Sequence, residues 1–203
     1  QNPSLCITGK SPGSRALQGS MDGSWSGYGS GGCGTWATAM CNRILGTASG
    51  EVTQQEWNDI ASGIGQDAGG GSSMTGQGDY YAGQGKAVET KAFGGSAADY
   101  AEIQEKLDEG CDVKLAFWQR NADGTYSNGH VETVTGTNGS SSATTNSWGQ
   151  SATVQGGSSG GFGHTGGAFP NSGTLWPAGS TEVEVQYICE KSVLQEIAEF
   201  FGF

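Results

Sequence analysis

Two short segments of the chain carry side chains whose chemistry combines in a hydrolase. Cys33 follows a run of glycine and serine and precedes Trp36, and His130 lies in the sequence Gly-His-Val-Glu. Asn146 follows in the sequence Asn-Ser-Trp-Gly. A thiol is a nucleophile, an imidazole is a proton carrier, and an amide can fix the tautomer of that imidazole. Together these side chains point to attack on a carbonyl group.

The element expected around Cys33 is a helix over residues 33–46. Apolar side chains recur after the glycine-rich run 29–32 with the spacing of one helical face, at Trp36, Ala37, Met40, Ile44 and Leu45. Cys33 would then lie at the N-terminus of the helix. Unpaired N–H groups and the positive end of the helix dipole stabilise a thiolate there, so we expect a lowered pKa for Cys33. The same N–H groups could face an oxyanion.

The element expected around His130 is a β-hairpin. His130 opens a strand-like segment at 131–134, and a second strand reaches 144–145, directly before Asn146. An asparagine at the end of that second strand can hydrogen-bond to the His130 ring.

Several further elements are expected from capping and periodicity. Thr53 and Glu56 form a capping-box pattern before a short helix, and a second helix begins at 96–99 and stops at Gly110. Strands are expected at 113–118 and 182–188. Helices first and an antiparallel sheet after them predict an α+β fold.

Two glycine-rich stretches interrupt this pattern. Residues 62–85 are expected to form a loop, either the rim of a substrate groove or a connector, and 155–174 is a second such stretch. His164 lies in the second stretch with no strand pattern to hold it. We therefore expect it to face solvent, and it is the other histidine that could compete with His130.

These motifs resemble the papain-like cysteine peptidase superfamily. The segment from Cys33 to Met40 is similar to the Cys-Gly-Pro-Thr-Ser-Leu-Ala-Met helix of peptidases related to the bacteriocin-leader-processing group, with Thr35 in place of proline. Asn-Ser-Trp-Gly is found in papain itself. The resemblance implies that Cys33 is the nucleophile, His130 the general base and acid, and Asn146 the orienting residue. It also implies that Gln18 completes the oxyanion hole.

The length of 203 residues fits one domain, and the resemblance, which covers roughly residues 15–150, implies that this domain, 1–203, is papain-like. Its nucleophile helix would belong to an N-terminal helical part packed on an antiparallel β-sheet. Residues 1–32 are expected to form an irregular N-terminal arm, and residues 190–203 a C-terminal amphipathic helix.

The cysteine count restricts the disulfide pairing. Five cysteines leave at least one outside any intramolecular scheme. Cys33 and Cys41 lie about 12 Å apart along one helix, too far for a bridge. If the other four pair, the free thiol is Cys33, and all three pairings of Cys6, Cys41, Cys111 and Cys189 stay open. Five reduced cysteines in a cytoplasmic protein are the alternative.

Composition restricts the partners. Only 34% of residues are hydrophobic and 38 are glycine, so the core is modest and the loops are extensive. The net charge of −11 argues against nucleic acid or an anionic membrane as partner. No apolar run reaches the roughly 18 residues of a membrane span. No spacing typical of metal ligands or of a phosphate-binding loop is present, so we expect no cofactor and no metal.

These observations predict a secreted or periplasmic thiol hydrolase, active as a monomer on peptide or protein substrates. The start at Gln1, the abundance of glycine, serine and threonine, and the scarcity of lysine favour an exported chain. Two alternatives remain. One is a peptidoglycan amidase or endopeptidase similar to the CHAP group, and the other is a non-catalytic binding module with Cys33 in a disulfide.

Overall fold

The computed structural model describes most of the central part of the chain. The described residues are 32–50, 52–66, 72–120, 122–124, 126–145, 151–157, 161–166, 175–176, 181–192 and 201. The expected N-terminal arm, apart from its last residue, and most of the expected C-terminal helix lie outside them. So do the candidate residues Gln18 and Asn146.

The described residues form helices on a single antiparallel sheet. The helices are α2 (Cys33–Ile44), α3 (Gln54–Gly63), α4 (Met74–Ala82) and α5 (Ala97–Asp108). The strands are β1 (Ala87–Ala92), β2 (Asp112–Arg120), β3 (Tyr126–Thr137), β4 (Ser141–Thr145), β5 (Ser151–Gly157), β6 (Gly161–Gly166), β7 (Leu175–Trp176) and β8 (Thr181–Cys189). The coarse α+β prediction is confirmed.

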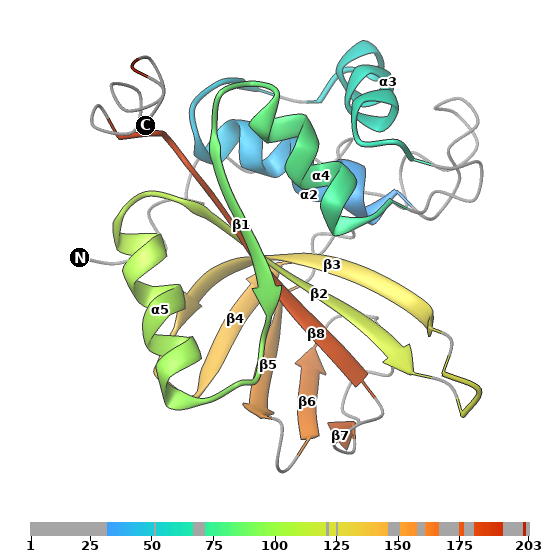
Figure 1. Cartoon of the computed structure of the whole chain (residues 1–203), viewed down its shortest axis with the longest axis vertical. Coiled ribbons are helices and arrows are strands. Elements are labelled where there is room, and N and C mark those ends of the chain that lie inside the picture. The colour runs from blue at the N-terminus through green and yellow to red at the C-terminus, as the bar shows by residue number, and fades with distance from the viewer. Residues whose placement is uncertain are drawn as a thin grey trace.

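The strand order in the sheet is β1-β8-β2-β3-β4-β5-β6-β7. From β2 to β7 each strand pairs with its neighbour in sequence, whereas β8 returns to lie between β1 and β2. Figure 1 shows α2, α3 and α4 gathered at the top of the molecule and α5 at the left side of the sheet. The last long strand, β8, therefore connects the edge strand β1 to β2 and the rest of the sheet.

Side-chain alternation along the strands places hydrophobic clusters on both faces of the sheet. Leu115 and Phe117 of β2 belong to the cluster that contains Tyr100 and Ile103 of α5. Ala116, between them, belongs to the cluster under α2, α3 and α4. Successive side chains of a strand point to opposite faces, so α5 covers one face and the other three helices cover the other.

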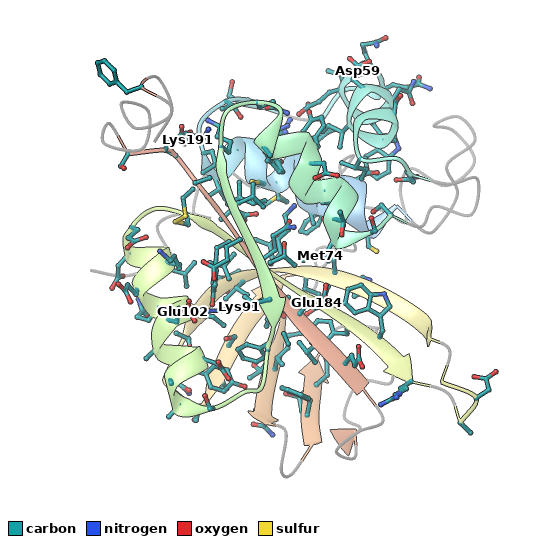
Figure 2. The ribbon with its side chains drawn as sticks, in the orientation of Figure 1. Asp59, Met74, Lys91, Glu102, Glu184 and Lys191 are labelled. Carbon is teal, nitrogen blue, oxygen red and sulfur yellow. A yellow bond between two sulfur atoms is a disulfide. The ribbon has the colours of Figure 1, made fainter. Side chains whose placement is uncertain are left out.

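Helix α5 forms where its capping pattern predicts it. The Ser96 side chain accepts a hydrogen bond from the Asp99 backbone N–H, and the Asp99 carboxylate accepts one from the Ser96 backbone N–H. The helix is also joined to the edge strand β1, since Lys91 Nζ lies 2.5 Å from Glu102 Oε2. Figure 2 shows Lys91 and Glu102 directed toward each other between β1 and α5.

The prediction of loops in the glycine-rich stretches is wrong in two places. Helix α4 lies within 62–85, and its N-terminus is capped by the Ser73 side chain, which accepts from the Gly76 N–H at 2.9 Å. Strand β6 lies within 155–174 and pairs with β5. Glycine weakens the local signal for both elements, and packing and pairing within the fold override it.

Within the described residues, no helix has the length and apolar character needed to cross a membrane.

Candidate functional site

Cys33 is the first residue of α2, and it lies against the central sheet. Its thiol is free and only partly exposed, and it packs on the apolar cluster that includes Ala116 and Val131. Burial raises the pKa of Cys33, and backbone hydrogen bonds from Val131 and Gly34 oppose that rise. The expected lowering of the pKa at the helix N-terminus is therefore outweighed by desolvation.

The close packing around Cys33 requires glycine at position 34. A Cβ built there would overlap the Ser72 hydroxyl and lie 2.9 Å from Gln77 Nε2. Gly129, which precedes His130, is under the same constraint, because a Cβ added at this position would lie 2.9 Å from Trp118 Nε1. The glycines beside Cys33 and His130 thus let neighbouring elements approach closely.

His130 lies in β3 and is almost fully buried, with 4% of its surface exposed. It pairs with Phe117 across the β2–β3 ladder, and its side chain leaves the strand on the same face as Glu132. Burial lowers the pKa of His130 to about 4, against the opposing effect of the Glu132 charge. The imidazole is therefore neutral at neutral pH.

The structure brings Cys33 and His130 to the same part of β3. The Cys33 thiol receives a hydrogen bond from the backbone of Val131, the residue that follows His130. Val131 points toward α2, whereas strand alternation directs His130 toward the opposite face. The two groups therefore approach one peptide unit of the strand, the unit that joins His130 to Val131.

A fully buried carboxylate, Glu132, lies beside His130. Its Oε1 is 3.6 Å from His130 Nε2 and 3.0 Å from His164 Nε2. Its Oε2 accepts a hydrogen bond from Thr144 Oγ1 at 2.6 Å. We refer to His130, Glu132, Thr144 and His164 as the histidine–glutamate cluster.

The expectation that His164 faces solvent is wrong. His164 is completely buried in β6, where it pairs with Val154, and its ring meets Phe117 edge-on at 6.0 Å between centroids. The segment Gly161–Gly166 alternates glycine with larger residues, and pairing with β5 holds it as a strand. Both histidines of the chain therefore contact one carboxylate.

Sequence reasoning missed Glu132, Thr144 and His164 as members of this cluster. One signal was present, because His130 and Glu132 are two residues apart and a strand places such residues on one face. No comparable signal linked His164 to them, since it is 32 residues further along the chain from Glu132.

The disulfide pattern agrees with one of the expected bridges. Cys111 and Cys189 form a disulfide, with their Cα atoms 4.4 Å apart. Cys41 is a free thiol, buried beside Tyr81 and Ile188. The predicted scheme of two disulfides among Cys6, Cys41, Cys111 and Cys189 is therefore wrong at Cys41. Cys6 lies outside the described residues.

The residues available to hold a metal ion are few. Among the described residues, one group of three potential ligands, Glu109, Cys111 and Cys189, has its ligand atoms within 4.8 Å of one another. Both sulfur atoms of this group are used in the disulfide. A cavity of about 430 Å³ beside this disulfide is lined by Glu89, Lys106 and Glu190 among others, and its lining includes neither Cys33 nor His130.

No family model and no curated protein sequence matches the chain.

Proposed function

We propose that this protein is a papain-like thiol hydrolase that cleaves peptide bonds, with Cys33 as nucleophile and His130 as general base. One observation carries the proposal: a free thiol at the first turn of α2 is hydrogen-bonded to the backbone of Val131, directly after His130 in the chain. A free thiol at a helix N-terminus is typical of such a nucleophile. The base role of His130, whose side chain leaves β3 on the opposite face, comes from the family resemblance.

The protonation states set the order of events. The pKa of Cys33 is raised and the pKa of His130 is about 4, so the resting pair is a thiol and a neutral imidazole. The mechanism requires the His130 ring to reach the face of β3 on which Cys33 lies. There it takes the thiol proton as the sulfur attacks the substrate carbonyl, forming a C–S bond and an oxyanion. The backbone N–H of Cys33 donates to that oxyanion.

Collapse of the tetrahedral intermediate breaks the C–N bond, and the imidazolium gives its proton to the leaving amine. Water then attacks the thioester, losing a proton to His130, which returns it to the Cys33 sulfur as the acid product leaves. Gln18 would add a second donor to the oxyanion and Asn146 would orient His130, as the family resemblance implies.

A secreted or periplasmic location belongs to the same proposal. The Cys111–Cys189 disulfide supports it, because disulfides persist in oxidising compartments and are rare in the cytosol of most cells.

The test is a turnover assay on a mixed peptide library and on purified peptidoglycan, with mass spectrometry of the protein to detect an acyl group on Cys33. We expect turnover by the wild type, none by Cys33→Ala, and unchanged turnover by the matched control Cys41→Ala, since Cys41 is fully buried. Peptide cleavage and peptidoglycan cleavage distinguish a peptidase from a cell-wall enzyme. Turnover that survives Cys33→Ala, or no turnover of either substrate, overturns the proposal.

A further inference from the structure

We propose that the Ser72 hydroxyl donates a hydrogen bond to the oxyanion formed at Cys33. Gln77, held in place by Lys114, is the positioning residue for that hydroxyl. This inference rests on the proposed function, since the oxyanion arises only if Cys33 attacks a carbonyl group. It adds a donor from the segment before α4, distinct from Gln18, to which the family resemblance gives a similar role.

The groups involved lie on the face of the sheet that carries Cys33. Lys114 is on β2, two residues before Ala116, so both side chains leave the strand on the same face. Ala116 belongs to the apolar cluster on which Cys33 packs. Lys114 Nζ also lies 3.5 Å from Thr38 Oγ1 of α2. Lys114 therefore approaches the helix of the nucleophile from the side of the sheet on which the thiol lies.

Two hydrogen bonds connect Lys114 to Ser72 through Gln77. Lys114 Nζ donates to Gln77 Oε1 at 3.3 Å, and Gln77 Nε2 donates to Ser72 Oγ at 3.3 Å. Lys114 and Gln77 are at most 1% exposed, whereas Ser72 is partly exposed. A serine hydroxyl has one O–H donor and two lone pairs, so the bond from Gln77 uses a lone pair and leaves the O–H to donate.

Ser72 contacts α2 at the residue that follows Cys33. A Cβ built on Gly34 would overlap Ser72 Oγ, so the hydroxyl lies directly against the Gly34 backbone. The Cys33 thiol is itself hydrogen-bonded to the backbone of Gly34 and to its own backbone. The oxyanion forms on the carbon bound to this sulfur, beside the same helical turn. The Ser72 O–H thus supplements the backbone N–H of Cys33 at the place where negative charge develops.

The start of α4 keeps Ser72 in this position. The next residue, Ser73, caps the helix by accepting from the Gly76 N–H at 2.9 Å. The Met74 carbonyl oxygen accepts from Gln186 Nε2 of β8 at 2.8 Å. Figure 2 shows Met74 at the end of α4 that lies next to the sheet. Ser72 is therefore held before substrate arrives, and a donor held in advance needs no reorganisation during the reaction.

The experiment compares two reactions of the same thiol. A peptide aldehyde adds to it reversibly: the sulfur bonds to the carbonyl carbon and the thiol proton ends on the carbonyl oxygen, which takes the place of the oxyanion. Iodoacetamide alkylates the sulfur with loss of iodide and a proton, and forms no oxyanion. Affinity for a set of N-acetylated dipeptide aldehydes is measured against Cys33→Ala, and alkylation is measured by peptide mapping at Cys33.

The first variant is Ser72→Ala, which removes the proposed donor. We expect kcat and the affinity for the aldehydes each to fall about a hundredfold, with little change in KM. The rate of alkylation at Cys33 should stay the same, because that reaction needs the thiol and no oxyanion donor. An equal loss in alkylation would place the effect on the thiol itself and overturn the proposal.

The second variant is Gln77→Glu, which keeps an acceptor for Lys114 and presents an acceptor to Ser72 in place of an N–H. The Ser72 O–H then turns toward residue 77 and away from the oxyanion. We expect this variant to match Ser72→Ala in kcat and aldehyde affinity. Ser73→Ala is the matched control, since this exposed neighbour caps α4: its urea midpoint should fall while its kcat and aldehyde affinity stay unchanged.

The outcomes separate this inference from the proposed function. Turnover by the wild type, with unchanged kcat and aldehyde affinity in Ser72→Ala, refutes the donor role and leaves the hydrolase. Aldehyde addition at Cys33 that weakens in Ser72→Ala, in a protein without turnover, supports the donor role and refutes the hydrolase. A protein that neither turns over peptides nor adds the aldehydes at Cys33 refutes both.

Discussion

At the scale of single residues, the burial of His130 connects the site to stability. The folded-state pKa of about 4 lies below the ordinary value of 6.5, so the unfolded chain binds a proton more readily between these values. The free energy of unfolding therefore decreases as the pH falls from 6.5 to 4. Below pH 4 the contribution of His130 no longer changes with pH. The full effect of such a shift is about 3 kcal/mol.

We expect His130→Gln to remove this part of the pH dependence. Urea unfolding of both proteins at pH 7.5 and pH 4.0 gives the measurement, and the wild type should lose about 3 kcal/mol more than the variant over that interval. Other ionisable groups contribute equally to both proteins and cancel in the difference. Parallel pH dependences for the two proteins would show that His130 titrates in the folded protein as it does in the unfolded chain.

The same residue illustrates what the sequence could predict about the site. Residue types and order were enough to select Cys33 and His130 and to place them at a helix start and on a strand. The direction of the Cys33 pKa was predicted wrongly, because desolvation depends on how α2 packs against Val131, and packing cannot be derived from local spacing. The contact of Glu132 with His164 depends on pairing between strands far apart in sequence.

At the scale of elements, a buried arginine joins α2 to α3. Arg43 is 1% exposed, and its guanidinium donates to both Glu56 carboxylate oxygens, at 2.7 and 2.9 Å. It also donates to the carbonyl oxygens of Ala39 and Gly50. The pair fixes the position of α3 relative to the helix that carries Cys33.

We expect Glu56→Gln to destabilise the protein by about 2 kcal/mol, because it leaves the buried guanidinium without its counter-charge while Glu56 itself is partly exposed. The measurement is the urea midpoint of unfolding, with Glu105→Gln on the exposed side of α5 as the matched control. A shift no larger than that of the control would show that solvent or another acceptor replaces Glu56.

The elements also show where sequence patterns succeed and where they fail. Helix α5 has both a capping box and an apolar face, and it forms as predicted. At α3 only half of the predicted capping box forms: Thr53 caps the helix, whereas the Glu56 side chain turns to Arg43. Helix α4 contains two glycines and has no clear apolar face, so its helical state depends on Ser73 and on packing against β1 and β8.

At the scale of the whole molecule, the sheet is assembled from segments distant in sequence. Strand β8 lies between β1 and β2, and the disulfide joins Cys111, just before β2, to Cys189 at the end of β8. The sequence separation of the two cysteines is 78 residues. All strands from β2 to β8 therefore lie within the closed loop, including those that carry the histidine–glutamate cluster.

A crosslink over so long a loop restricts the unfolded chain strongly. The chain-entropy relation for 78 residues gives a stabilisation of about 4.5 kcal/mol. We expect the double variant Cys111→Ala/Cys189→Ala to lose about that amount in urea unfolding, and reduction of the wild type to produce the same loss. Cys41→Ala is the control for removal of a buried sulfur outside the disulfide. Equal stability of the double variant and the wild type would contradict this stabilisation of the folded state through restriction of the unfolded chain. A loss specific to the double variant would instead show that the disulfide offsets the modest hydrophobic core of this glycine-rich chain.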